Sequence, residues 1–123
     1  MSLDIEKVNV LEKSKLFQDT WAPRILGELN GQHVKVAYFE GEFGWHHHEL
    51  EDEMFYVISG EINIETRTET FNLKENEFVI IPKGVEHNPN AKEKSLVMLL
   101  EPLSTLNTGN TVTQNTVRNP EKI

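Results

Sequence analysis

The sequence predicts an all-β fold, an antiparallel sandwich or barrel. Apolar runs of strand length recur about every 8 to 12 residues between Val34 and Pro102, turn residues separate them, and none has a convincing helical period. The 123 residues fit one domain. We therefore expect an N-terminal arm with a first turn at 1–33, a barrel at 34–102 and a C-terminal arm at 103–123.

The N-terminal arm ends in a turn. Residues 5–17 hold scattered apolar side chains and neither glycine nor proline, so they could form one short helix or an irregular arm. Pro23 breaks any helix near it. Asn30 and Gly31 give a strong turn signal before the first expected strand.

The first two expected strands differ in pattern. Residues 33–40, "HVKVAYFE", alternate, with Val34, Val36 and Tyr38 on one face. Residues 54–59, "MFYVIS", are rich in β-branched and aromatic side chains, which is typical of strands.

Four further strands complete the expected barrel. Residues 61–66 alternate, and after a turn residues 70–73 return beside them. Residues 77–82, "EFVIIP", form a short run that the pattern predicts to be buried. Residues 94–102 form a last core strand, stopped by a proline. The Thr- and Asn-rich C-terminal arm is either a loosely ordered terminus or an arm across a partner subunit.

Composition excludes several classes of function. The net charge of -8 repels phosphate backbones and anionic lipid, so we expect neither nucleic acid nor membrane partners. The chain has no cysteine, which excludes disulfides and thiolate metal sites. The charged N-terminus does not resemble a signal peptide, and we expect a cytoplasmic protein.

Three consecutive histidines raise the question of a metal site. On an extended strand His46 and His48 point to the same side and His47 points to the other. A turn over residues 49–52 would let Glu53 open the next strand and return to the side of the two histidines.

His87 supplies a third imidazole. It follows Pro82 and Gly84, whose spacing suits a type I turn with proline at the second position. Imidazole suits Zn, Fe, Ni and Cu, and a carboxylate adds Mn. Four protein ligands would leave two positions of an octahedral ion open for chemistry. Alternatively, the histidines line a polar barrel mouth and hold only water.

The order of these residues resembles the first motif of the cupin superfamily. That motif is a glycine, two histidines one residue apart, a glutamate and a second glycine, which here are Gly41, His46, His48, Glu53 and Gly60. The only departure is the interval from Gly41 to His46, which holds four residues instead of five.

The second cupin motif is also present. Pro82, Gly84 and His87 match it, while Asn76 replaces its first glycine and Asn90 comes one position early. Asparagine tolerates the left-handed conformation that a turn needs at position 76. The role of Asn90 is in doubt, and no departure touches a candidate ligand.

The resemblance implies a jelly-roll β-barrel and a function. The chain resembles the small single-domain cupins of the mannose-6-phosphate-isomerase-like and dioxygenase-like group. It implies that His46, His48, Glu53 and His87 bind one divalent ion, Fe, Mn, Zn or Ni. A homodimer is also implied. We expect a metal-dependent enzyme on a small molecule, an isomerase or a dioxygenase. The alternatives are a non-catalytic protein that binds or senses a small ligand, and a structural dimer with a vestigial site.

Some neighbouring residues have expected positions. Trp45 should face away from the ligands, and Phe55 and Val57 share the strand parity of Glu53 and are candidates for a pocket wall. Few cations could meet an anionic substrate, because the candidates fall in apparent loops or tails: Arg24, Arg67, Lys83 and Arg118.

Overall fold

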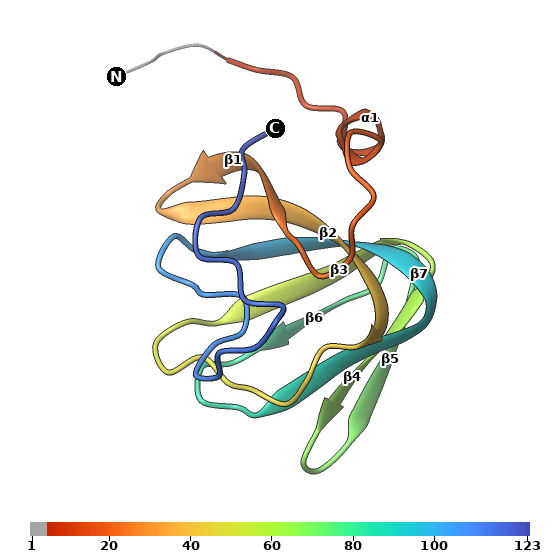
Figure 1. Cartoon of the computed structure of the whole chain (residues 1–123), viewed down its shortest axis with the longest axis vertical. Helices are drawn as coiled ribbons and strands as arrows, with labels where there is room; N and C mark the ends of the chain where they lie inside the picture. The colour runs from red at the N-terminus through yellow and green to blue at the C-terminus, as the bar shows by residue number, and fades with distance from the viewer. Residues whose placement is uncertain (1–4) are drawn as a thin grey trace.

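Seven strands, all paired antiparallel, build the fold in the computed structural model, which describes residues 5–123 (Figure 1). The all-β prediction is therefore confirmed. The strands are β1 (Arg24–Leu29), β2 (Gln32–Glu42), β3 (Glu53–Ser59), β4 (Glu61–Thr66), β5 (Thr70–Lys74), β6 (Phe78–Ile81) and β7 (His87–Pro102).

The long strand β7 joins the two halves of the barrel. Its residues 96–100 lie between β2 and β3, and its first residues, 87–90, pair with β4. Strand β6 flanks β3, and β5 flanks β4. The sequence predicted only residues 94–102, because Pro89 and the charged residues 92–94 do not look like a strand.

A strand that the sequence did not predict precedes the first turn. Strand β1 pairs with β2, and Asn30 and Gly31 between them have φ values of 48° and 75°, as a tight hairpin requires. Part of the segment 1–33 thus belongs to the sheet. Arg24 opens this strand and does not lie in a loop.

Two apolar clusters hold the barrel together. The interior contains Ala37 and Phe39 with ten further buried side chains: Trp21, Phe55, Val57, Ile62, Ile64, Leu73, Ile81, Ala91, Val97 and Leu99. On the outer face of β2, Val36 packs with Phe17, and the partly buried Val10 in helix α1 (Val10–Ser14) lies against them. The short N-terminal helix therefore covers the sheet from outside (Figure 1).

Strand β6 is less buried than its composition predicts. Phe78 and Ile80 are 50% and 55% exposed, whereas Ile81 faces the interior. The prediction of a buried run was wrong here, because β6 pairs only with β3 and turns one face to solvent.

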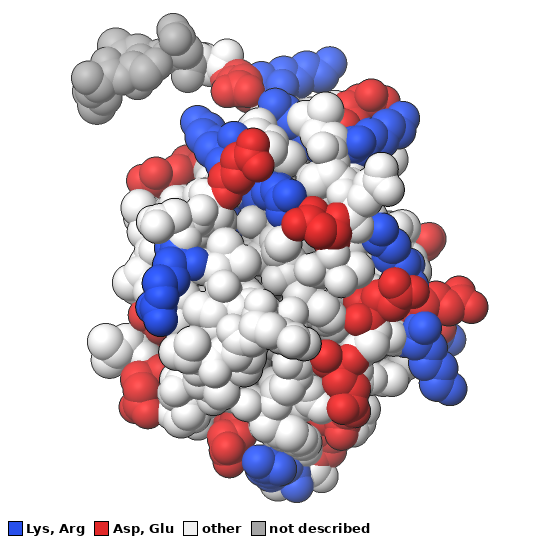
Figure 2. Space-filling view, viewed as in Figure 1, with Lys and Arg blue, Asp and Glu red and all other residues white. Residues whose placement is uncertain are grey.

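The C-terminal segment, residues 103–123, packs on the barrel of its own chain. Asn110 and His47 exchange two hydrogen bonds, and Ile123 bonds to Ile25 of β1. The centre of the face seen in Figures 1 and 2 carries few charged side chains, and acidic residues are spread around it. No helix of residues 5–123 is long and apolar enough to cross a membrane.

Candidate metal centre

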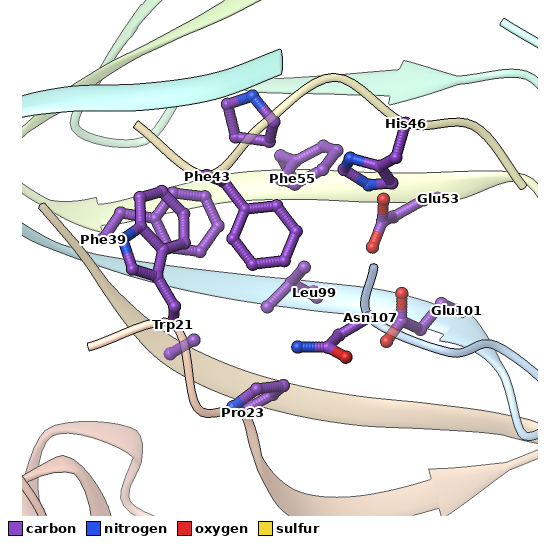
Figure 3. Close-up of a pocket in the computed structure, with 12 residues that line it drawn as sticks. Trp21, Pro23, Phe39, Phe43, His46, Glu53, Phe55, Leu99, Glu101 and Asn107 are labelled. Atoms are coloured by element: carbon purple, nitrogen blue, oxygen red, sulfur yellow. The ribbon is translucent and has the colours of Figure 1, made fainter. Parts of the chain in front are cut away.

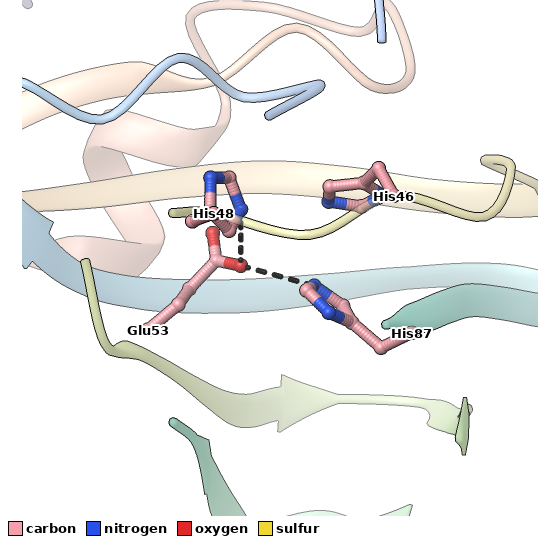
Figure 4. Close-up of side chains that lie close together, drawn as sticks. All are labelled: His46, His48, Glu53 and His87. Atoms are coloured by element: carbon pink, nitrogen blue, oxygen red, sulfur yellow. Dashed lines mark ion pairs between the residues drawn. The ribbon is translucent and has the colours of Figure 1, made fainter. Parts of the chain in front are cut away.

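Four buried side chains converge inside the barrel (Figure 4). His46, His48, Glu53 and His87 each offer one ligand atom, and these atoms lie within 4.8 Å of one another. None of the four residues is more than 4% exposed. The structure thus brings together the set that the sequence predicted, while His33 and His47 lie outside it.

A backbone bridge sets the distance between His46 and His87. The amide of each residue donates to the carbonyl of the other, with N to O distances of 3.0 and 2.9 Å. The two imidazole rings consequently lie 4.3 Å apart. Glu53 is the first residue of β3, as expected.

The turn before His87 differs from the predicted one. The carbonyl of Pro82 accepts from the amide of Val85, so proline is the first residue of the turn and Gly84 the third. Gly84 has a φ of 82°, which fits a type II turn and not the type I turn expected. The Gly84 amide donates to the carbonyl of His48, which ties the turn to a second ligand.

Hydrogen bonds orient two of the imidazoles. The Nδ1 atoms of His46 and His87 lie 3.0 and 2.9 Å from the carbonyl oxygens of Gly44 and Val85. A carbonyl accepts only, so each Nδ1 carries the proton and each Nε2 keeps its lone pair for a ligand bond. The buried side chain of Asn88 accepts from the Gly44 amide and fixes this loop.

Glu53 is held ionised by its neighbours. Its Oε1 lies 3.2 Å from Nε2 of His48 and 3.5 Å from Nε2 of His87. Burial opposes ionisation, but the neighbouring Glu101, His48 and His87 side chains outweigh burial and hold the pKa of Glu53 well below its ordinary value. Glu53 therefore presents a carboxylate to the three imidazoles.

Glu101 and Lys35 form a second buried layer that sequence reasoning missed. Lys35 Nζ lies 2.8 Å from Glu101 Oε1, and each residue is only 1% exposed. Burial and the charge of Glu53 raise the pKa of Glu101 well above its ordinary value. The available signal was strand parity, since Lys35 alternates with the interior residues Ala37 and Phe39.

The unsatisfied atoms at the centre fit a metal ion. His48 Nε2, Glu53 Oε1 and His87 Nε2 are buried and have no hydrogen-bond partner. Buried polar atoms are nearly always satisfied, so these need a ligand of their own. Three imidazoles and one carboxylate suit Fe, Mn, Zn or Ni.

A cavity of about 30 Å³ adjoins the centre (Figure 3). Phe55 lines it as expected, whereas Val57 lies in the core outside the lining. Trp45 lies outside this lining, and the Arg67 guanidinium lies 3.7 Å from its ring centroid. Aromatic walls and one polar end thus shape the space beside the four ligands.

The C-terminal segment closes this side of the site. Asn107 lines the cavity, and Thr108 is buried. Gly109 passes so close to the ligand loop that a Cβ there would lie 2.2 Å from the carbonyl oxygen of His47. The composition of this segment gave no sign of such a role.

Residues 32–101 match the family described as Cupin domain. The chain is a cupin. The jelly-roll barrel expected from the resemblance is confirmed, and this cupin has a buried His and Glu group that could hold a metal.

Its relatives include proteins with and without a solved structure. This cupin is 34% identical to the uncharacterized protein YdbB of Bacillus subtilis (strain 168) over 76% of this chain and 83% of that one. A cupin-2 domain containing protein from Shewanella frigidimarina superposes with a TM-score of 0.76 at 42% identity, over 77% and 93% of the two chains. Protein NMB1881 from Neisseria meningitidis, at 22% identity, shares the fold with a TM-score of 0.73 over 79% and 99%.

Metal-free protein should lose stability in acid through His46. Burial and the neighbouring His87 lower the pKa of His46 to about 4. The unfolded chain takes up this proton near pH 6.5 and the folded one only near pH 4, so stability falls as the pH drops through this window. The expected loss is about 3 kcal/mol.

Urea unfolding of wild type and His46→Gln at pH 7.5 and 4 measures this loss. The difference in the free energy of unfolding between the two proteins should change by about 3 kcal/mol between these two pH values. Glu101 acts in the opposite direction, because its pKa is raised. It is present in both proteins, so its contribution cancels. A difference that does not vary with pH would contradict the prediction.

Proposed function

We propose that this cupin is a metal-dependent enzyme that acts on a small molecule. The observation that carries the proposal is the set of unpartnered, buried ligand atoms of His48, Glu53 and His87 beside a cavity. A merely structural barrel gains nothing from orphaned polar atoms, because each costs free energy.

The three histidines and the glutamate would have different roles in binding the ion. His46, His48 and His87 supply neutral nitrogen ligands, and Glu53 supplies a charge that offsets part of a divalent ion. When bound, such an ion supplies Lewis-acid chemistry for an isomerisation or, as iron, chemistry with dioxygen. The aromatic walls and the C-terminal segment exclude bulk water from the substrate.

A second candidate is a binding or sensing protein without catalysis. The small size of the cavity favours it, since about 30 Å³ holds roughly two water molecules. Oxygen consumption with iron bound, and conversion of simple sugars or keto acids with zinc or manganese bound, separate the two candidates. Turnover supports the enzyme, and ligand binding without turnover supports the sensor.

Replacing His48 by alanine should abolish stoichiometric metal binding. Wild type is expected to bind one divalent ion per chain, and the variant should bind it at least about 100-fold more weakly, because even residues that only orient ligands are worth 10- to 100-fold. Metal analysis of purified protein and competition with a chelator measure this.

His47→Ala is the matched control for this experiment. It removes the neighbouring imidazole, which lies outside the ligand group and contacts the exposed Glu49. Its metal content should equal that of wild type. Equal trace metal in wild type, His48→Ala and His47→Ala would refute the proposed function and leave a vestigial site.

Homodimer formation and a cytoplasmic location stay predictions. The exposed Phe78 and Ile80 on β6 form an apolar surface on which a second copy would be sought. Sedimentation of wild type and of a Phe78→Glu variant would test it.

A further inference from the structure

The cavity wall beyond the ligands is aromatic. Trp21, Phe39, Phe43 and Phe55 line it (Figure 3). The ring of Trp21 lies 4.4 Å from that of Phe39 and 4.8 Å from that of Phe43. Phe43 in turn meets the ring of His46 edge-on at 5.2 Å. The wall therefore leads without interruption to a candidate metal ligand.

Trp21 is held in this wall against its backbone preference. Its φ is 59°, a left-handed conformation that is unfavourable for a large side chain, and its amide donates to the carbonyl of Tyr38. The indole Nε1 donates to the carbonyl of Glu40, so its hydrogen-bonding capacity is used there. Strained residues of this kind concentrate at functional sites.

The opposite end of the cavity, beside the candidate ligands, has no lysine or arginine side chain among residues 5–123. Its polar side chains, in the described part of the chain, are His46, Glu53, Glu101 and Asn107. Lys35, behind this end, has its ammonium group committed to Glu101. The Asn107 amide is engaged as well, because it donates to Asn115 and accepts from Val117.

Charge therefore limits what the cavity accepts. With an oxygen of the ligand at the metal end, a phosphate or another dianion at the far end would lose its hydration against aromatic walls, with no arginine or lysine to replace water. A sugar phosphate is a poor fit for that reason. A planar apolar group, by contrast, loses little on desolvation and gains contact with four aromatic rings.

We infer that the cavity selects an uncharged molecule with a metal-binding oxygen at one end and a compact planar apolar body at the other. This inference rests on the metal-dependent function proposed above and names its class of substrate. The oxygen end lies beside His46 and Glu53, and the apolar body packs on Phe39, Phe43 and Trp21. The cavity holds roughly two water molecules, so side chains of its lining must move to admit such a molecule.

Three hydroxamates with the same chelating head test the inference on cobalt(II)-loaded protein. Visible absorption of the cobalt gives the affinity for acetohydroxamate, benzohydroxamate and phosphonoacetohydroxamate. We expect benzohydroxamate to bind at least about 10-fold more tightly than acetohydroxamate, because its ring is buried. Phosphonoacetohydroxamate should bind at least about 10-fold more weakly than acetohydroxamate, because its anion is left unpaired.

Two phenylalanine variants test whether the preference for benzohydroxamate arises from the aromatic wall. Phe43→Leu should reduce the benzohydroxamate preference about fivefold, the typical effect of losing an aromatic pair, and leave the cobalt spectrum unchanged. Phe78→Leu alters an exposed phenylalanine on β6 and should retain the full preference.

The outcomes separate this inference from the proposed function. A protein that takes up no cobalt overturns both. A normal cobalt spectrum with equal affinities for all three probes, or with the phosphonate bound most tightly, overturns the inference alone. A preference for benzohydroxamate that survives Phe43→Leu unchanged also overturns it.

Discussion

Replacing Glu101 by leucine is expected to destabilise the protein by roughly 3 to 5 kcal/mol. The substitution removes the acceptor 2.8 Å from Lys35 Nζ and leaves a buried ammonium group, in a residue that is only 1% exposed, without its hydrogen-bond partner. Removing one partner of such a buried pair costs more than the pair itself contributes, because the ammonium group that remains is neither solvated nor hydrogen-bonded. Urea unfolding of the metal-free protein measures the loss.

The double variant Lys35→Met/Glu101→Leu is the control. It removes both groups and fills their space with apolar side chains, so most of the lost stability should return. Substituting Lys15, whose pair with Glu12 lies on the surface, should have little effect. A loss below about 1 kcal/mol in Glu101→Leu would mean that Lys35 reaches water despite its burial.

Replacing Gly109 by alanine should increase the population of molecules in which the C-terminal segment has moved away from the candidate metal centre. The new Cβ would lie 2.2 Å from the carbonyl oxygen of His47 and 3.1 Å from Cδ2 of His46, and the φ of 59° already disfavours any side chain. Both neighbours lie in the loop that carries the candidate ligands His46 and His48, so the C-terminal segment must move away from this loop. Overpacking of this kind costs about 2 kcal/mol, which raises the open population about 30-fold.

Amide hydrogen exchange at Asn110 reads out this opening. Its amide donates to the His47 carbonyl only while the segment is closed. Gly41→Ala is the control, because Gly41 has a φ of 78° but nothing within 4 Å of an added Cβ. Unchanged exchange at Asn110 in Gly109→Ala would show that the segment tolerates the side chain in place.

The convergence of the four candidate ligands could be predicted because it depends on local geometry. His46 and His48 share a side through strand parity, and the turns before Glu53 and His87 end where the next strands begin. Asn76 has the left-handed φ of 68° that its place in the motif required. These features need only short-range rules.

Other features could not be predicted because distant contacts create them. Lys35 and Glu101 are 66 positions apart and meet only through the pairing of β2 with β7. The doubt over Asn90 is resolved by a distant partner, since it donates to Glu65 of β4, away from the ligands.

The packing of the C-terminal segment could not be predicted for a different reason. Its threonines and asparagines suggested a solvated tail, yet Thr105 and Thr108 are buried. Thr108 satisfies its hydroxyl on Thr116, and Asn107 bonds to the backbone near it. Local polar pairs replace the apolar packing on which sequence patterns depend.

Strand β7 carries His87 at its first position and Glu101 at its last but one. A slip of one residue in this strand would turn both side chains out of the barrel at once. A mispaired conformer could therefore keep much of its β content and still lose His87 from the candidate ligand group. Metal uptake during refolding would accordingly report correct strand alignment, which circular dichroism alone does not distinguish.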